Sequence, residues 1–210
     1  MKNSKCKICR KAGVKLFLKG ERCFLAKCSM VKRPFPVRKK GKRRTRMLSE
    51  YGKELKEKQK LKNLYNLRET QFRKYVKEVL GSRGRGQKDT ANLLIGILES
   101  RLDNVIFRLG MAPSRLGARQ MVSHNHFSVD GKRVNIPSFQ VKKGAIIKIT
   151  SKSLPKKIFQ NISARLKKQN IPSWLELDAD KLEGKIIREP SFEDAALSIE
   201  ISAIFEYYSR

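Results

Sequence analysis

Four cysteines are the residues of this chain whose type and spacing are best suited to chemistry. They are Cys6, Cys9, Cys23 and Cys28, in the pattern C-x2-C-x13-C-x4-C. Two close pairs separated by a short loop can bring four thiolates to one tetrahedral centre, the geometry that zinc prefers. We therefore predict that they hold Zn²⁺. An iron–sulfur cluster is the alternative cofactor, and two disulfides or four unrelated buried thiols are the alternative without a cofactor.

A segment this short cannot bury enough apolar area to fold alone, so we expect its folding to depend on the metal. Phe17, Leu18, Phe24 and Leu25 are expected to form its small apolar plug. Nearby lysines and arginines, including Arg10, Lys27 and Lys32, would offset the negative charge of a Zn(Cys)₄ centre and still face a phosphate backbone.

The charge of the chain indicates a polyanionic partner. The 210 residues include 49 Lys and Arg against 19 Asp and Glu, a formal net charge of +30. The first 50 residues carry 18 basic and 2 acidic residues, whereas residues 171–210 carry 4 basic and 9 acidic ones. Such an excess repels itself unless a polyanion neutralises it, which favours nucleic acid. A hydrophobic content of 40% excludes a wholly disordered basic tail.

Residues 31–46 contain two prolines, one glycine and no acid, so they cannot form a core. We interpret them as an arm that becomes ordered along a groove of folded RNA, and the alternative is a solvated linker. The arm residues predicted to contact RNA are Lys39, Lys40, Arg43, Arg44 and Arg46. No apolar stretch follows Met1 and no apolar run exceeds a few residues, so we expect neither a signal peptide nor a membrane span.

Apolar periodicity predicts two consecutive helices, the first beginning near Ser49 and the two joined near Asn66. The glycine-rich segment 81–86 lacks the Lys-Ser/Thr of a phosphate-binding P-loop, so we expect a turn and no nucleotide site. Further helices are predicted at about 90–100, at 101–109 ending at Gly110, and after Pro113 and Ser114.

Strands are expected at 127–129, 133–136 and 145–149, with a hairpin turn at Asp130 and Gly131. Residues 152–168 resemble a helix, and 174–178 and 185–188 resemble two strands that join the same sheet, with Trp174 in the core. The apolar alternation near the C-terminus indicates a segment that returns to the first helical domain.

Four arginines of the central region form a candidate RNA surface. Arg101 and Arg108 lie seven residues apart, and Arg115 and Arg119 lie four apart on the next helix. Guanidinium groups bind phosphate oxygens bidentately, and Ser114 with the free N–H groups of its helix start would add an anion site. The two histidines, His124 and His126, have no carboxylate or cysteine arranged beside them, so we expect no enzymatic activity. Ordinary solvated charges are the alternative for each cation.

The stretch RLDNVIFRLGMAPSRLGARQMVSHNHFSVDGKRVNIPS resembles the small RNA-binding domain named for ribosomal protein S-four. The segments LSEYGKELKEKQKLKNLY, PSWLELD and LEGKIIREP resemble the rest of that family. With the four cysteines, the chain is similar over nearly its whole length to the zinc-ligand form of the bacterial-type small-subunit S-four family. Asn125 stands where the family usually has Gly, and Asn is the next best residue for a positive φ.

This resemblance implies an α+β fold with a Cys₄ metal knuckle and basic arm at 1–45 and a helical domain at 46–90 completed by 180–210. An inserted RNA-binding domain of helices and a small antiparallel sheet would occupy 91–179, with its helix-helix-hairpin motif at about 99–150. The resemblance supports RNA contacts by Arg101, Arg108, Ser114, Arg115, Arg119, Gln120 and Lys132.

The resemblance also implies a structural constituent of the small ribosomal subunit that binds small-subunit rRNA directly, nucleates assembly and contributes to translational accuracy. Its implied neighbours are ribosomal proteins S-three and S-five and the mRNA near its channel into the ribosome, with no membrane and no small-molecule substrate. The implied location is cytoplasmic, and an organellar ribosome is compatible with it. An autonomous RNA-binding regulator, such as a translational repressor or antitermination factor, is the alternative function.

Overall fold

The computed structural model describes residues 5–33, 47–81, 87–160, 162–167, 169–195 and 198–209, without the side chains of residues 87–89. By its contacts the chain divides into two compact units. The first is Met1–Ala91 with Ser198–Arg210, and the second is Asn92–Leu197. The boundary falls within helix α5, Gln87–Glu99. The five predicted RNA contacts of the basic arm and the glycine-rich segment 82–86 lie outside the described residues.

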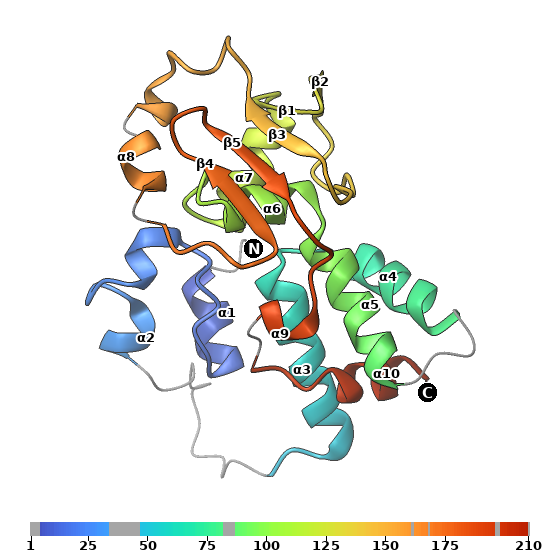
Figure 1. Ribbon diagram of the computed structural model, residues 1–210. Helices are drawn as coiled ribbons and strands as arrows, with labels where there is room; N and C mark the ends of the chain where they lie inside the picture. The colour runs from blue at the N-terminus through green and yellow to red at the C-terminus, as the bar shows by residue number, and fades with distance from the viewer. Residues whose placement is uncertain are drawn as a thin grey trace. The chain divides into compact units, whose positions relative to one another are not determined.

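The described elements of the first unit are helical (Figure 1). They are α1 Lys5–Ala12, the 3-10 turn η1 Gly20–Cys23, α2 Ser29–Lys32, α3 Glu50–Leu64, α4 Glu69–Gly81 and α10 Ile201–Ser209. Ser49 caps α3, because its Oγ accepts a hydrogen bond from the Gly52 N–H at 3.3 Å. Asn66, with φ +54°, makes the turn to α4. The two predicted helices and their junction are therefore confirmed.

The C-terminal segment forms α10, which packs against α3 and α4. A partly buried polar cluster fixes this contact. Lys58 of α3 is 4% exposed, and its Nζ donates to Glu69 Oε1 at 2.8 Å and lies 4.2 Å from the Tyr207 ring centroid. Tyr208 of α10 donates to the same carboxylate at 2.8 Å. The segment that was expected to return to the first helical domain thus forms a helix there.

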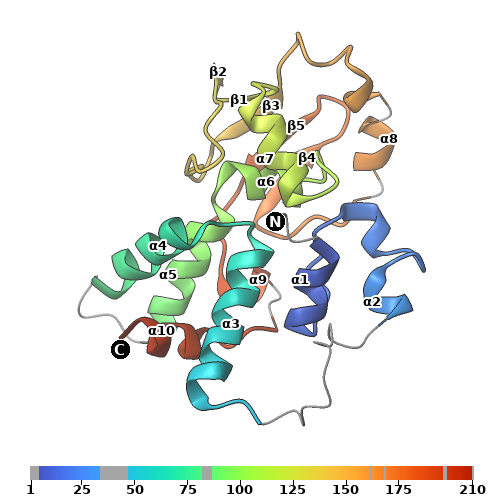
Figure 2. The same ribbon diagram turned by 180° about the vertical axis from the view of Figure 1, so that it is seen from behind.

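The second unit is a five-stranded antiparallel sheet with helices around it. Its elements after α5 are α6 Leu102–Arg108, α7 Arg115–Ser123, β1 Phe127–Val129, β2 Lys132–Arg133, β3 Ile146–Ile149, η2 Lys157–Phe159, α8 Ile162–Leu166, β4 Leu175–Asp178, β5 Glu183–Ile186 and α9 Phe192–Ala195. The strand order is β2-β1-β3-β5-β4. Helices α6 and α7 cover one face of the sheet, as the front and rear views both show (Figures 1 and 2).

The core of the second unit lies between these two helices and the sheet. Trp174, Leu102, Ile106 and Phe127 are fully buried there. Leu109, directly after α6, fills the space that a side chain at Gly184 of β5 would occupy, so any larger residue there would displace this buried leucine. The predicted burial of Trp174 is confirmed. The α+β character of the fold is confirmed by this sheet and its helices.

Several predicted boundaries differ from the structure. The helix expected at 152–168 is wrong in its first half, where turns and η2 occupy residues 151–160, and among the described residues of this segment only Ile162–Leu166 of α8 are α-helical. Ile158 of this segment is 57% exposed. The second hairpin strand ends at Arg133, so Ile136 is 56% exposed.

Strand β5 also differs from its prediction. It begins two residues earlier than expected, at Glu183, and pairs with both β3 and β4. Residues 183–186 therefore belong to the sheet and not to the helical domain to which 180–210 were assigned. None of the helices in the described parts of the chain is long and apolar enough to cross a membrane.

Candidate nucleic-acid interface

Two local signals build the hairpin end of the second unit. Asp130 and Gly131 have φ +49° and +78°, which gives the turn between β1 and β2 its positive-φ geometry. Asp130 Oδ1 also accepts from the Ile146 N–H at 2.8 Å and so joins the turn to β3. Asn125, with φ +58°, makes the expected turn before β1. Lys132 follows this turn and is exposed on the edge strand β2.

A buried carboxylate organises the arginines of α6 and α7. Glu99 is fully buried at the end of α5, and Arg108 binds it through Nε at 2.9 Å and Nη2 at 2.7 Å. Asn104 donates to Glu99 Oε2 at 2.7 Å and accepts from Arg115 Nε at 2.8 Å. The Arg115 guanidinium also lies 4.6 Å from the Phe107 ring centroid. We call Glu99, Asn104, Arg108 and Arg115 the Glu99 network.

Arg101 has a structural role, so its prediction as an RNA-facing side chain is wrong. It is 0% exposed, precedes α6 in extended conformation, and binds Asp103 through Nε at 3.0 Å and Nη2 at 2.7 Å. Burial raises the pKa of Asp103, and the charges of Arg101 and Arg119 oppose that rise. A buried guanidinium needs a carboxylate partner, so this pair holds the start of α6.

Ser114 caps α7, because its Oγ accepts from the Gly117 N–H at 3.2 Å. Its hydroxyl is mostly buried and already used. The predicted contacts thus fall into two groups. Arg108, Ser114, Arg115 and Arg119 are buried or half-buried, whereas Gln120 and Lys132 are exposed. The exposed group faces solvent as an RNA contact must.

The histidines have a structural environment. His126 is 4% exposed, its Nδ1 lies 2.8 Å from Ser153 Oγ, and that hydroxyl lies 2.8 Å from Thr150 Oγ1. Burial lowers the pKa of His126, with smaller contributions from Lys156 and His124. The imidazole therefore links β1 to the turns after β3.

The comparisons with known proteins cover both units. The family model for the ribosomal protein S4/S9 N-terminal domain matches residues 1–99, and that for the S4 domain matches residues 100–147. A small ribosomal subunit protein uS4 of Caldicellulosiruptor saccharolyticus is 46% identical over 98% of this chain and 96% of its own length. A uS4 of Thermus thermophilus is 42% identical with the same coverage. This chain belongs to the uS4 family. The family is one of ribosomal proteins, which agrees with the prediction of no enzymatic activity.

In this uS4-family chain the four cysteines lie in one small module of the first unit. Cys6 and Cys9 are on α1, Cys23 ends η1 and Cys28 precedes α2. All four are free thiols, and Cys9, Cys23 and Cys28 are buried. Burial raises the pKa of Cys9, a backbone hydrogen bond with Leu16 lowers it, and the other three thiols raise it through their charges. The Lys19 N–H donates to Cys23 Sγ at 3.4 Å.

The described residues contain no group of three or more Cys, His, Asp or Glu side chains arranged closely enough to hold a metal ion. The chemistry of the donors suits a thiolate-binding metal, because all four cysteines belong to this one module and a backbone amide hydrogen-bonds the sulfur of Cys23. The expected apolar plug is wrong in part. Phe24 is 75% exposed and Leu25 is 55% exposed, whereas Leu16 supplies the buried side chain.

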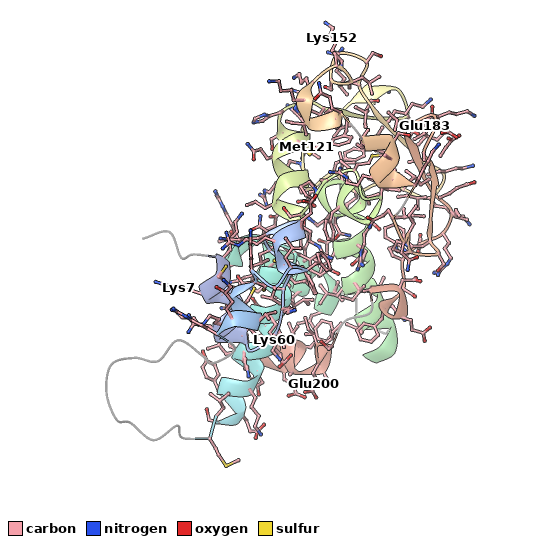
Figure 3. The ribbon with its side chains drawn as sticks, turned by 90° about the vertical axis from the view of Figure 1, so that its left-hand side faces the viewer. Lys7, Lys60, Met121, Lys152, Glu183 and Glu200 are labelled. Atoms are coloured by element: carbon pink, nitrogen blue, oxygen red, sulfur yellow. The ribbon has the colours of Figure 1, made fainter. Side chains whose placement is uncertain are left out.

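The cysteine module also contains a basic hollow that the sequence analysis did not find. It has a volume of about 660 Å³ and is lined by Arg10, Glu21, Arg22, Leu25, Lys27, Ser29, Lys32 and Arg33. Of these described lining residues, five are basic and one is acidic. Basic residues that alternate with aromatic and apolar ones between residues 17 and 33 are the sequence signal that could have found it. Figure 3 shows Lys7 projecting outward from α1 of the same module, and Lys152 projecting from the loop after β3 in the second unit.

Proposed function

We propose that this chain is a structural constituent of the small ribosomal subunit and binds small-subunit rRNA directly. Its similarity to small ribosomal subunit proteins uS4 over nearly the whole chain carries this conclusion. The net charge of +30 supports it, since a polyanion must neutralise so large an excess.

Phosphate contacts supply most of the proposed affinity. Exposed cations such as Lys132, Arg133, Lys142 and Lys143 surround the hairpin turn and the loop before β3. The Glu99 network keeps α6 and α7 fixed against each other and against α5, so that α7 presents Arg119 and Gln120 at constant spacing. Contacts of this kind recognise the shape of folded RNA with little readout of base sequence.

The finer role that the sequence implies belongs to the same proposal. It includes early nucleation of subunit assembly, an effect on translational accuracy, neighbours S-three and S-five, and mRNA close to its channel into the ribosome. Co-sedimentation with small subunits after a high-salt wash supports the structural role. Recovery of the protein only on particular messengers would instead indicate the regulatory alternative.

We propose that Cys6, Cys9, Cys23 and Cys28 hold Zn²⁺. The metal would crosslink α1, η1 and the start of α2, which bury little apolar surface together. Metal analysis and absorbance of anaerobically purified protein test this assignment. One equivalent of zinc in a colourless sample supports it, and visible absorbance with stoichiometric iron and sulfide would indicate an iron–sulfur cluster.

Salt dependence tests the direct binding of rRNA. If about eight phosphates are neutralised, the affinity for naked small-subunit rRNA should fall by roughly 10³- to 10⁵-fold between 50 and 200 mM salt. Lys132→Gln should reduce the slope of log affinity against log salt by about 0.9. Lys181→Gln is the matched control, because Lys181 is exposed but lies 3.7 Å from Asp178 on the β4–β5 turn. A flat salt profile for the unaltered protein would contradict the proposal.

A further inference from the structure

An exposed aromatic pair stands out in the cysteine module. Phe24 is 75% exposed, and its ring stacks on Phe17 with centroids 4.9 Å apart and an interplanar angle of 28°. Phe17 has φ +49°, a backbone conformation that a bulky residue adopts only at a cost. One face of the Phe24 ring packs on Phe17, and most of the Phe24 side chain is exposed to solvent. The exposed Phe24 ring is therefore accessible to a ligand.

The lining of the basic hollow includes the residue that follows Phe24 in the sequence. Leu25, the residue after Phe24, lines the hollow together with Arg22, Lys27 and Arg33. Among the described residues these three cations form no ion pair with a carboxylate, in contrast to the arginines of the Glu99 network. Its volume of about 660 Å³ lies within the range of roughly 300–1,000 Å³ that is common for ligand sites. Its charge selects an anionic ligand.

We propose that Phe24 is a stacking platform for one unpaired base of the rRNA, and that the hollow binds the phosphates beside that base. This inference rests on the proposed binding of rRNA. Unpaired nucleotides offer both an exposed aromatic face and a phosphate chain, which matches an exposed aromatic ring that is one residue away in sequence from the lining of a basic hollow. Bases inside a duplex have no free face. The site therefore selects a loop, bulge or junction over a regular helix, which phosphate contacts alone do not do.

A change of the Phe24 ring tests the stacking directly. The full chain carrying Phe24→Leu keeps an apolar side chain but loses the aromatic face, so its affinity for naked small-subunit rRNA should fall roughly 5- to 100-fold. Its salt slope should not change, because stacking releases no counterions. Phe24→Trp should restore the affinity. Phe139→Leu is the matched control, since Phe139 is a 39% exposed phenylalanine of the second unit.

The phosphate half of the proposal is tested with Arg33→Gln, which should reduce the salt slope by about 0.7, the value for one phosphate contact on a single strand. Chemical probing of the rRNA should show one unpaired base that the unaltered protein and Phe24→Trp protect and that Phe24→Leu leaves reactive. Circular dichroism of each variant separates these effects from loss of folding, and the Trp variant keeps the test valid if the Leu variant does not fold.

Three results would overturn the stacking of Phe24 on a base. Equal affinity and protection with Phe24→Leu would show that the ring does not stack on a base. An equal loss with Phe24→Trp would show that Phe24 serves packing. If Phe24→Leu bound rRNA normally but no longer bound a neighbouring ribosomal protein, the ring would be shown to contact protein. In these three cases direct rRNA binding stands, whereas failure of the unaltered chain to bind naked rRNA overturns both proposals.

Discussion

The Glu99 network and the basic hollow use the same type of side chain in opposite ways. In the network, Arg108 and Arg115 lie against a fully buried carboxylate and an asparagine, with side chains 18% and 11% exposed. In the hollow, Arg22, Lys27 and Arg33 surround an open space of about 660 Å³ with Glu21 as the acidic lining residue among those described. In the Glu99 network the positive charge is neutralised within the protein, and in the basic hollow it stays available to a ligand.

This difference shows that a count of arginines does not locate an RNA surface. A guanidinium paired with a buried carboxylate stabilises the fold and adds little to the field outside it. A guanidinium without such a partner attracts phosphate and makes binding depend on salt. Variants in the two regions should therefore change different measurements.

Glu99→Gln should have the largest effect on stability. It leaves the buried guanidinium of Arg108 without its charge partner, which costs about 3–5 kcal/mol. The urea midpoint and the thermal midpoint of the second unit should both fall strongly. Glu176→Gln, an exposed position on β4, is the matched control and should change little. A Glu99→Gln protein as stable as the parent would show that the network does not hold α6.

Glu69→Gln should have a smaller, pH-dependent effect in the first unit. Burial raises the pKa of Glu69, but hydrogen bonds from Lys58, Lys62 and Tyr208 outweigh it and lower the pKa to about 2, below its usual 4.5. The carboxylate therefore adds stability above about pH 4.5, and this contribution disappears as the pH falls towards 2.

The Glu69 side chain is 44% exposed, so solvent screening limits the expected loss to about 1–2 kcal/mol at pH 7. Between pH 5 and 2 the unfolding free energy of Glu69→Gln should vary less than that of the parent. Glu206→Gln on α10 is the control, and urea unfolding across this pH range is the measurement. Parallel pH profiles for parent and Glu69→Gln would show that this carboxylate is not an anchor of α10.

The smallest change in stability is expected for a cation of the basic hollow. Arg33→Gln should leave the unfolding free energy within about 0.5 kcal/mol of the parent, because an exposed cation stabilises little. Arg108→Gln should instead lower stability without a comparable change in the salt slope of rRNA binding. Measurement of both quantities for both variants decides the point. If the two variants behave alike, the division between structural and ligand-binding cations is wrong.

Local signals in the sequence predicted much of the fold correctly. Ser49 and Ser114 cap their helices, Gly110 ends α6 with φ +76°, and Asp130 with Gly131 makes the hairpin turn. Each of these depends on the backbone preferences of one or two residues. The first half of the helix expected at 152–168 did not form, because apolar spacing there was only partly periodic and Pro155 disfavours a helical conformation of the residue before it.

The candidate site was predicted less well because burial depends on distant residues. The sequence by itself determined the excess of positive charge, the four clustered thiols and the family of the chain. Only the tertiary structure decided that Arg101 pairs with Asp103 inside the protein, and that Phe24 stacks on Phe17 in water. Helical spacing fixes which side chains share a face, but packing between elements decides whether that face meets a carboxylate, a hydrophobic core or solvent.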